Sequence, residues 1–224
     1  MPTRPSPPLI RAVLTGDIVK SSDLPPEARR RLPEMIRQVG IDLRKAWPQA
    51  VPAAPSVFRG DSWQLLISEP VRAIRAALFF RAGVIASARA EALDTRISLV
   101  IGPVDFVPAK ATEGDGPAYR ASGRGLDEMK ASNRLNLLDL TGTLPALPVV
   151  APLFDAIMQD WTARQAQAVQ GRLRGWNQSK ISERFQPQPI TQQSVAAHLG
   201  AAHWEAIENA LSALESDWPA APNS

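Results

Sequence analysis

The sequence contains no cysteine and only two histidines among its 224 residues. The missing thiols exclude disulfide bonds, thiolate zinc sites, iron–sulfur clusters and cysteine nucleophiles. The scarcity of histidine disfavours Ser–His catalysis and histidine-rich metal sites. Any chemistry of this chain must therefore come from carboxylates, arginines, lysines and backbone groups.

The chain also lacks any run of eighteen apolar residues, which excludes a transmembrane helix. Its first residues, MPTRPSPPLIRAV, lack the apolar stretch of a signal peptide, so we expect a cytoplasmic protein without a membrane partner. No GxxxxGK[ST] or GxGxxG motif occurs, so P-loop and Rossmann sites gain no support. The apolar content of 45% is sufficient for a folded core.

The net charge of +3 is unevenly distributed along the chain. Residues 151–218 hold five basic and seven acidic groups, so this segment carries −2 and the rest of the chain +5. A stretch punctuated by prolines, TGTLPALPVVAP at 141–152, lies where the charge changes. We therefore predict two domains, 9–150 and 151–218, with flexible tails at 1–8 and 219–224.

Strand and helix patterns alternate through the first domain. We expect strands at 9–19, in 56–68 as a hairpin turning at Gly60-Asp61, and at 96–104, with helices beginning near Leu32 and at Pro70. This β-α-β-β-α-β order predicts an α+β fold with a ferredoxin-like sheet. A helix near 117–131 and a strand at 134–140 are expected to follow.

The second domain has helical patterns at 152–174, 178–185, 191–200 and 201–215. The middle two, QSKISERF and TQQSVAAHLG, resemble a helix-turn-helix, whose second helix would expose Gln192, Gln193, Ser194 and His198 to read base edges of double-stranded DNA. Two features oppose DNA binding. The five-residue connection is long, and the segment is acidic. A packing module of three helices is the alternative.

Two carboxylates carry the main functional hypothesis. In a ferredoxin-like sheet the first and third strands are antiparallel neighbours, so Asp17 in TGDIV should lie near Asp61 in RGDSW. Two carboxylates at one sheet edge suit a magnesium ion that binds nucleotide phosphates. The alternative is structural, because Gly-Asp is common in hairpin turns and Asp often caps a segment.

A glycine-rich loop leads into the predicted helix near 117–131. Gly114 and Gly116 would leave the N–H groups of the helix N-terminus free to bind an anion, and Arg120 and Arg124 share one helix face that suits phosphate. Asp115 is either a third acidic ligand or a turn residue. The alternative to phosphate binding is that Arg120 and Arg124 simply face solvent on an amphipathic helix.

These motifs resemble known families. TGDIVKSS and RGDSWQLLI are similar to the metal motifs of class III nucleotidyl cyclases, and RISLVIGPV followed by GDGPAYRASGRGL resembles their later strand and helix. The SatD family of bacterial proteins is a closer match. Its members share the TGDIV-type start, the hairpin Gly-Asp, the DGPA-Y start of the later helix and a C-terminal helix-turn-helix. The resemblance implies a palm-type domain with Mg²⁺ or Mn²⁺ at Asp17 and Asp61, a nucleotide ligand and a homodimer.

The sequence departs from the cyclases at one catalytic position. Counted from Gly116, the cyclase asparagine is replaced by Arg120, whereas the arginine that stabilises phosphate charge is kept as Arg124. The resemblance thus favours a nucleotide- and metal-binding regulator coupled to a DNA-binding helix-turn-helix. The alternatives are a Mg²⁺-dependent nucleotidyl cyclase or nucleotidyltransferase, and a degenerate interaction module.

Overall fold

A computed structural model describes residues 8–88 and 92–219, so most of both predicted tails lies outside the described residues. Within these ranges, strands form one sheet in the order β2–β3–β1–β4–β5. Their bounds are β1 (Leu9–Ile18), β2 (Ser56–Phe58), β3 (Ser62–Ile67), β4 (Thr95–Val104) and β5 (Leu135–Asp139). β1 lies antiparallel between β3 and β4, whereas β5 runs parallel to β4.

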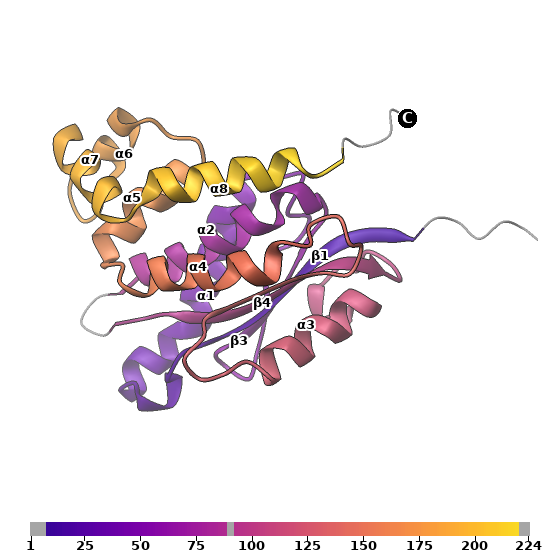
Figure 1. The fold of residues 1–224 in the computed structure, drawn as a ribbon. Coiled ribbons are helices and arrows are strands. Elements are labelled where there is room, and N and C mark those ends of the chain that lie inside the picture. Colours follow the sequence, from indigo (N-terminus) through magenta and orange to yellow (C-terminus); the bar gives the residue numbers. More distant parts are fainter. Residues whose placement is uncertain (1–7, 89–91, 220–224) are drawn as a thin grey trace, which may run out of the picture.

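Helices cover both faces of this sheet. α1 (Pro26–Ala46) and α2 (Ala73–Ala86) connect the strands across one face, and α3 (Pro117–Asp127) packs on the other, against β1 and β4 (Figure 1). The α+β architecture and the β-α-β-β-α-β order predicted from the sequence are therefore confirmed. Within the described ranges, the helices are all too short or too polar to cross a membrane.

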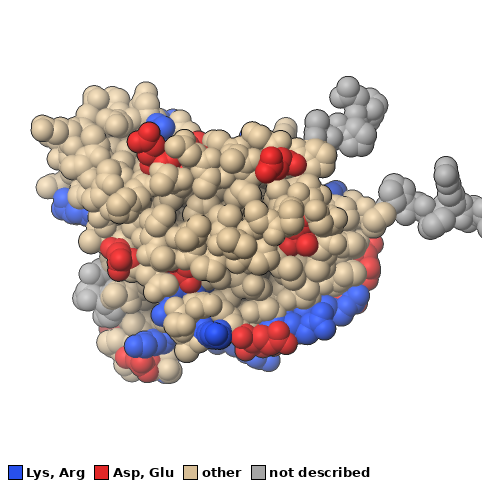
Figure 2. Space-filling view, in the orientation of Figure 1, with Lys and Arg blue, Asp and Glu red and all other residues tan. Residues whose placement is uncertain are grey.

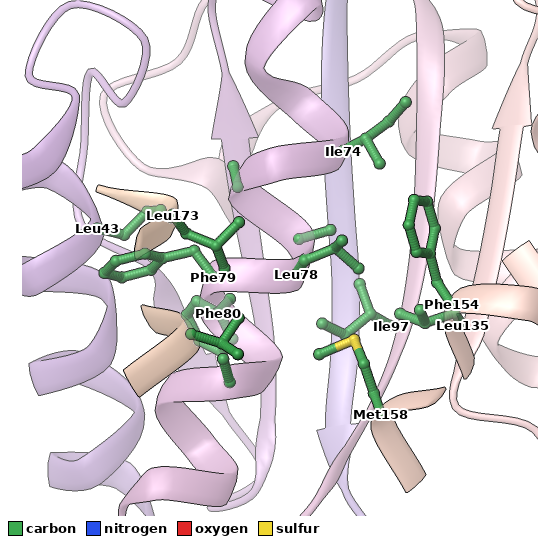
Figure 3. Packing of buried hydrophobic residues seen from close by; sticks show 14 of the residues in the cluster. Leu43, Ile74, Leu78, Phe79, Phe80, Ile97, Leu135, Phe154, Met158 and Leu173 are labelled. Atoms are coloured by element: carbon green, nitrogen blue, oxygen red, sulfur yellow. The ribbon is translucent and has the colours of Figure 1, made fainter. Parts of the chain in front are cut away.

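The alternation of side chains along β1 explains how the two faces differ. Ala12 and Leu14 point into the large core beneath α1 and α2, whereas Val13 packs in a smaller cluster beneath α3. α2 is buried at every position from Ala73 to Ile85, because it lies between the sheet and other helices. Figure 3 shows Leu78 and Phe80 of this helix in the core.

The C-terminal helices extend that same core. They are α4 (Leu147–Gln159), α5 (Ala163–Leu173), α6 (Gln178–Arg184), α7 (Gln192–Ala201) and α8 (Trp204–Ser216). The single helix predicted for 152–174 is wrong, because Thr162 and Gln165 form a capping box that starts α5 as a new helix. The predicted domain boundary after residue 150 falls inside α4, so the chain crosses it as a continuous helix.

Two local predictions also need correction. The hairpin between β2 and β3 turns over three residues, Arg59 to Asp61, rather than over Gly60-Asp61 alone, because Arg59 and Gly60 have φ values of 54° and 90°. The first helix begins at Pro26 rather than near Leu32, and Pro33 lies inside it. The predicted buried face of this helix is confirmed at Leu32, Ile36, Val39 and Leu43.

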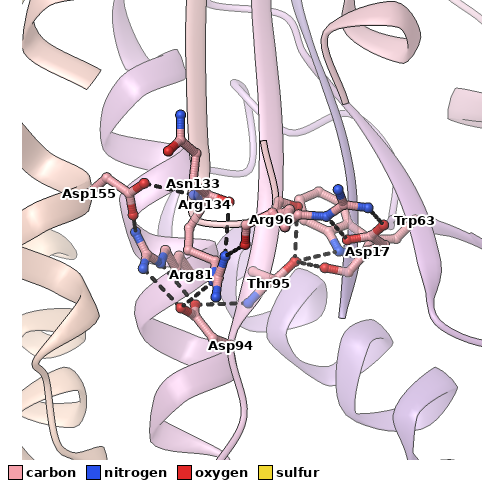
Figure 4. Close-up of polar contacts among 10 residues, drawn as sticks. Asp17, Trp63, Arg81, Asp94, Thr95, Arg96, Asn133, Arg134 and Asp155 are labelled. Atoms are coloured by element: carbon pink, nitrogen blue, oxygen red, sulfur yellow. Dashed lines mark hydrogen bonds and ion pairs between the residues drawn. The ribbon is translucent and has the colours of Figure 1, made fainter. Parts of the chain in front are cut away.

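A buried ion network joins α2 to α4 and to the start of β4 (Figure 4). The fully buried Arg81 donates to both carboxylate oxygens of Asp94, each at 2.9 Å, and to Asp155 at 2.7 Å. The second oxygen of Asp155 accepts the backbone N–H of Arg134 at 2.7 Å. Every charge in the network therefore has a partner, which a buried charge requires.

We predict that Arg81→Met destabilises the protein by about 3–5 kcal/mol, because it leaves the buried carboxylate of Asp155 without its cation. Urea unfolding followed by circular dichroism measures this loss. Arg44→Met, which removes an exposed arginine from α1, is the matched control and should change stability by less than about 0.5 kcal/mol. Equal effects of the two substitutions would show that the network does not stabilise the fold.

Candidate functional site

The strand register places Asp17 beside the hairpin that carries Asp61. Asp17 near the end of β1 is paired with Ser62 of β3, and the N–H of Ile18 donates to the carbonyl oxygen of Asp61 at 3.2 Å. The two aspartates, 44 positions apart in the sequence, therefore lie at one edge of the sheet. The backbone arrangement matches the one expected from the ferredoxin-like topology.

Asp17 forms an ion pair with Arg96, which is directly opposite it on β4. Arg96 Nε donates to Oδ1 of Asp17 at 2.9 Å, and Nη2 donates to Oδ2, so the pair is bidentate (Figure 4). This hydrogen bonding raises the pKa of Arg96, although burial opposes it. Arg96 is not recognisable as a site residue from the sequence, because only the register of β1 against β4 shows that the two side chains meet.

The carboxylate of Asp61 is held by two hydroxyl groups. Ser21 donates to Oδ2 of Asp61, and Ser62 donates to Oδ1 at 3.3 Å. Ser21 begins a short 3-10 helix, η1 (Ser21–Asp23), and follows Lys20, which has a φ of 51°. The segment after β1 thus turns back to contact the hairpin.

Gly16 allows the backbone beside Asp17 to pack tightly. A Cβ atom at this position would lie 2.5 Å from the ring of Trp63 and 2.5 Å from the carbonyl oxygen of Arg96. The Trp63 indole donates to the hydroxyl of Thr95 at 3.2 Å, and that hydroxyl donates to the carbonyl of Asp17 at 2.6 Å. The glycine in TGDIV therefore lets Trp63 and Thr95 hold the end of β1.

A cavity of about 430 Å³ lies between the segment after β1, the end of α2 and α4, and neither Asp17 nor Asp61 is in its lining. Its lining includes Lys20, Asp94, Arg134 and Trp161. Lys20 is exposed, and Arg134 Nε lies 3.6 Å from a carboxylate oxygen of Asp94. Asp23 also lines the cavity, so two cations and two carboxylates lie next to an apolar wall, and the volume is large enough for a small ligand.

The glycine-rich loop lies at the other end of the sheet from Asp17. The N–H of Asp105, just after β4, donates to the carbonyl of Asp115 at 2.9 Å, so the loop follows the end of β4. Arg96 is near the start of the same strand, and residues 96 and 104 are separated by about 26 Å at 3.3 Å per residue. One chain therefore does not bring Gly114 and Gly116 together with the two aspartates.

The two arginines of α3 have different surroundings. Arg120 forms an ion pair with Asp115 at 2.6 Å, and the same carboxylate oxygen accepts the N–H of Gly116 at 2.6 Å. Asp115 therefore acts as a turn residue that also neutralises Arg120. Arg124 is exposed. Figure 2 shows basic and acidic side chains together along the lower edge of the molecule, where α3 lies in Figure 1.

A buried polar contact connects α3 to the site. Ser122 of α3 and Thr15 of β1 form a hydrogen bond of 2.8 Å. Ser122 is two residues before Arg124, and Thr15 is two residues before Asp17.

The Tyr119 hydroxyl is buried without a hydrogen-bond partner among the described residues, and burial raises its pKa to about 12. Tyr119 packs against Gly114, where a Cβ atom would lie 2.3 Å from the hydroxyl oxygen.

The donor set at the sheet edge fits a divalent cation in chemical type. Carboxylate oxygens suit Mg²⁺ and Mn²⁺, and Mg²⁺ is commonly held by one or two carboxylates, with waters and substrate phosphates completing its coordination. Asp17 and Asp61 would be those two ligands. The described residues contain no cluster of three or more acidic, histidine or cysteine side chains that would form a complete protein cage.

The residues expected to read DNA do not all face outward on α7. Gln192 and Gln193 are exposed, whereas Ser194 and His198 are half-buried. Ser194 hydrogen-bonds to the N-cap residue Thr191, and the His198 ring stacks on Phe185 with 5.8 Å between centroids. Burial lowers the pKa of His198, and the charge of Arg164 lowers it further.

We predict that His198 titrates below the ordinary histidine value of about 6.5. Because its pKa is lower in the folded protein than in the unfolded chain, the stability that it contributes is lost as the pH falls below about 6.5. Titration of the two imidazole C–H signals by NMR measures the pKa, and His198→Gln assigns them. A His198 pKa at or above about 6.5 would contradict the packing on Phe185.

Comparisons with known proteins found likenesses among solved structures but none among family models or curated sequences. Among solved structures, the catalytic core of a rhodopsin-guanylyl cyclase with converted specificity, in complex with ATPalphaS, is 19% identical. The match covers 58% of this chain and 77% of that one, with a TM-score of 0.44. The fold described above rests on the strand order and register.

Proposed function

We propose that the sheet edge carrying Asp17 and Asp61 binds a divalent cation together with the phosphates of a nucleotide. The observation that carries this proposal is the register that places Asp17 opposite Ser62, beside the hairpin of Asp61. Lys20, which is exposed just after β1, supports it, because its charge would attract an anionic ligand.

The ion pair with Arg96 regulates access to this site. A guanidinium that occupies both oxygens of Asp17 competes with a metal ion for the same carboxylate. Metal binding therefore requires Asp17 to exchange Arg96 for the cation, which frees the guanidinium to bind phosphate. The bound metal would shield the phosphate charge, while the serine hydroxyls keep the carboxylate of Asp61 oriented.

A homodimer is part of the proposal. Within one chain the glycine-rich loop and the aspartates lie at opposite ends of β4, so a joint site would need the loop of a second copy. The resemblance to class III cyclases and to the SatD family favours such pairing, with the nucleotide acting as a regulatory ligand. Arg124 is exposed on α3 and therefore accessible to a partner.

We predict that Arg96→Gln tightens Mn²⁺ binding by about tenfold, because it removes the competing cation from Asp17. Asp17→Asn and Asp61→Asn should each weaken binding by about tenfold or more. Titration with Mn²⁺ alone, followed by electron paramagnetic resonance of the free ion, measures all three affinities. The titration contains no nucleotide, because Arg96→Gln would also remove contacts to the nucleotide phosphates. That loss would hide the expected gain in Mn²⁺ affinity.

The control is Asp217→Asn, which removes an exposed carboxylate after α8 and should leave Mn²⁺ affinity unchanged. If wild-type protein binds no Mn²⁺, the proposal is wrong. It is equally wrong if Asp17→Asn binds the ion as well as the wild type.

The enzymatic alternative has its own test. A nucleotidyl cyclase or nucleotidyltransferase would form product from nucleoside triphosphates with Mn²⁺, and this product would disappear with Asp17→Asn. The replacement of the cyclase asparagine by Arg120, which is paired with Asp115, favours binding without turnover. Product formation that depends on Asp17 would replace the regulatory proposal with the enzymatic one.

Reading of double-stranded DNA by α7 is a second candidate function. It is favoured by the exposure of Gln192 and Gln193 in the first turn of the helix, where side chains of a recognition helix contact bases. Selection from a random DNA library tests it. A selected sequence that Gln193→Ala binds more weakly would support DNA reading, and the absence of any retained DNA would contradict it.

A further inference from the structure

A second cavity, of about 390 Å³, lies between α2, α5 and α8. It is far from the two aspartates, because Arg72 and Arg75 in its lining follow the end of β3, whereas Asp17 is paired with the start of that strand. Four arginines and two glutamates line the cavity, which gives it a charge of +2.

The two glutamates are already paired. Arg75 donates to Glu215 at 2.7 Å and to Glu208 at 3.0 Å, and Arg72 lies 3.8 Å from Glu215. Burial acts to lower the pKa of Arg75, but the hydrogen bonds and charges of these carboxylates raise it overall. The acidic groups thus neutralise Arg72 and Arg75, and the surplus positive charge belongs to Arg172 and Arg174.

Arg174 has no carboxylate partner among the described residues, and its Nε is buried without a hydrogen-bond acceptor in the same ranges. Its guanidinium lies 4.9 Å from the ring centroid of Phe79 and 4.5 Å from that of Trp176. These rings orient the cation but leave its hydrogen-bond donors unused. Burial lowers the pKa of Arg174, against the opposing charge of Asp42.

Arg172 is the second unneutralised cation. One of its guanidinium nitrogens donates to the backbone carbonyl of Trp176 at 3.0 Å, and the group lies 5.8 Å from the ring of Trp204. Both arginines are near the C-terminus of α5, whose dipole favours positive charge. The dipole accounts for cations at this helix end, but it supplies no acceptor for the buried donor of Arg174.

We propose that this cavity is a binding site for a small phosphate-bearing anion, held by Arg172 and Arg174. Guanidinium groups match phosphate oxygens with paired hydrogen bonds, and an anion here would neutralise the +2 charge. Ser212 of α8, which also lines the cavity, supplies a further hydroxyl donor. Because the ligand would contact both α5 and α8, it would join these helices at the surface of α2.

We predict that the full-length protein binds pyrophosphate without any divalent metal, and that Arg174→Gln weakens this binding at least tenfold. Isothermal titration calorimetry with EDTA present measures the affinity, with inorganic phosphate as the smaller probe. Arg164→Gln is the matched control, because it removes the same charge from an exposed position on the same helix. Its affinity should stay within about twofold of the wild type.

Two further variants keep the outcome clear. Arg172→Gln should weaken binding in the same way if Arg174→Gln fails to fold, which thermal unfolding detects. Asp17→Asn should bind pyrophosphate as tightly as the wild type, because the sheet edge is a separate site. If the sheet edge with Asp17 and Asp61 binds no Mn²⁺, the proposal for the arginine-lined cavity is therefore unaffected.

The proposal is overturned if pyrophosphate shows no saturable binding to the wild type at millimolar concentration. It is also overturned if Arg164→Gln weakens binding as much as Arg174→Gln, because the effect would then reflect net charge alone. A bound anion should in addition raise the melting temperature of the wild type but not that of Arg174→Gln.

Discussion

The register of β1 between β3 and β4 is the constraint on which the candidate site depends. A shift by one residue would turn every side chain of β1 to the other face and move Asp17 from its place opposite Arg96. Gly16 and Trp63 help to set this register, since the indole ring occupies the space that a Cβ atom at position 16 would need. The same register places the hairpin of Asp61 beside the end of β1.

Patterns local in the sequence predicted the fold well. The strand and helix order followed from apolar periodicity, and the closeness of Asp17 and Asp61 followed from the topology that this order implies. The boundary between α4 and α5 was missed, because the apolar pattern continues across it while the capping box at Thr162 restarts the helix. A local polar signal, rather than hydrophobic periodicity, determined the break.

Contacts between distant segments were not predictable in this way. Arg96 is an unremarkable residue of a strand in the sequence, yet it neutralises Asp17 from the neighbouring strand. The glycine-rich loop looked like part of the same site, but the length of β4 separates it from the aspartates. Both outcomes depend on strand direction and register, which residue types alone do not reveal. The surplus charge at Arg172 and Arg174 likewise emerges only when α2, α5 and α8 are packed together.

The central claim, a divalent cation at the edge carrying Asp17 and Asp61, is tested most directly by paramagnetic broadening. Mn²⁺ added at substoichiometric amounts to ¹⁵N-labelled protein should first broaden the amide signals of Ile18 and Ser62, which flank the two carboxylates. The amide of Asp217, after α8, should remain sharp. Broadening that spares Ile18 and Ser62, or that affects Asp217 equally, would contradict the account.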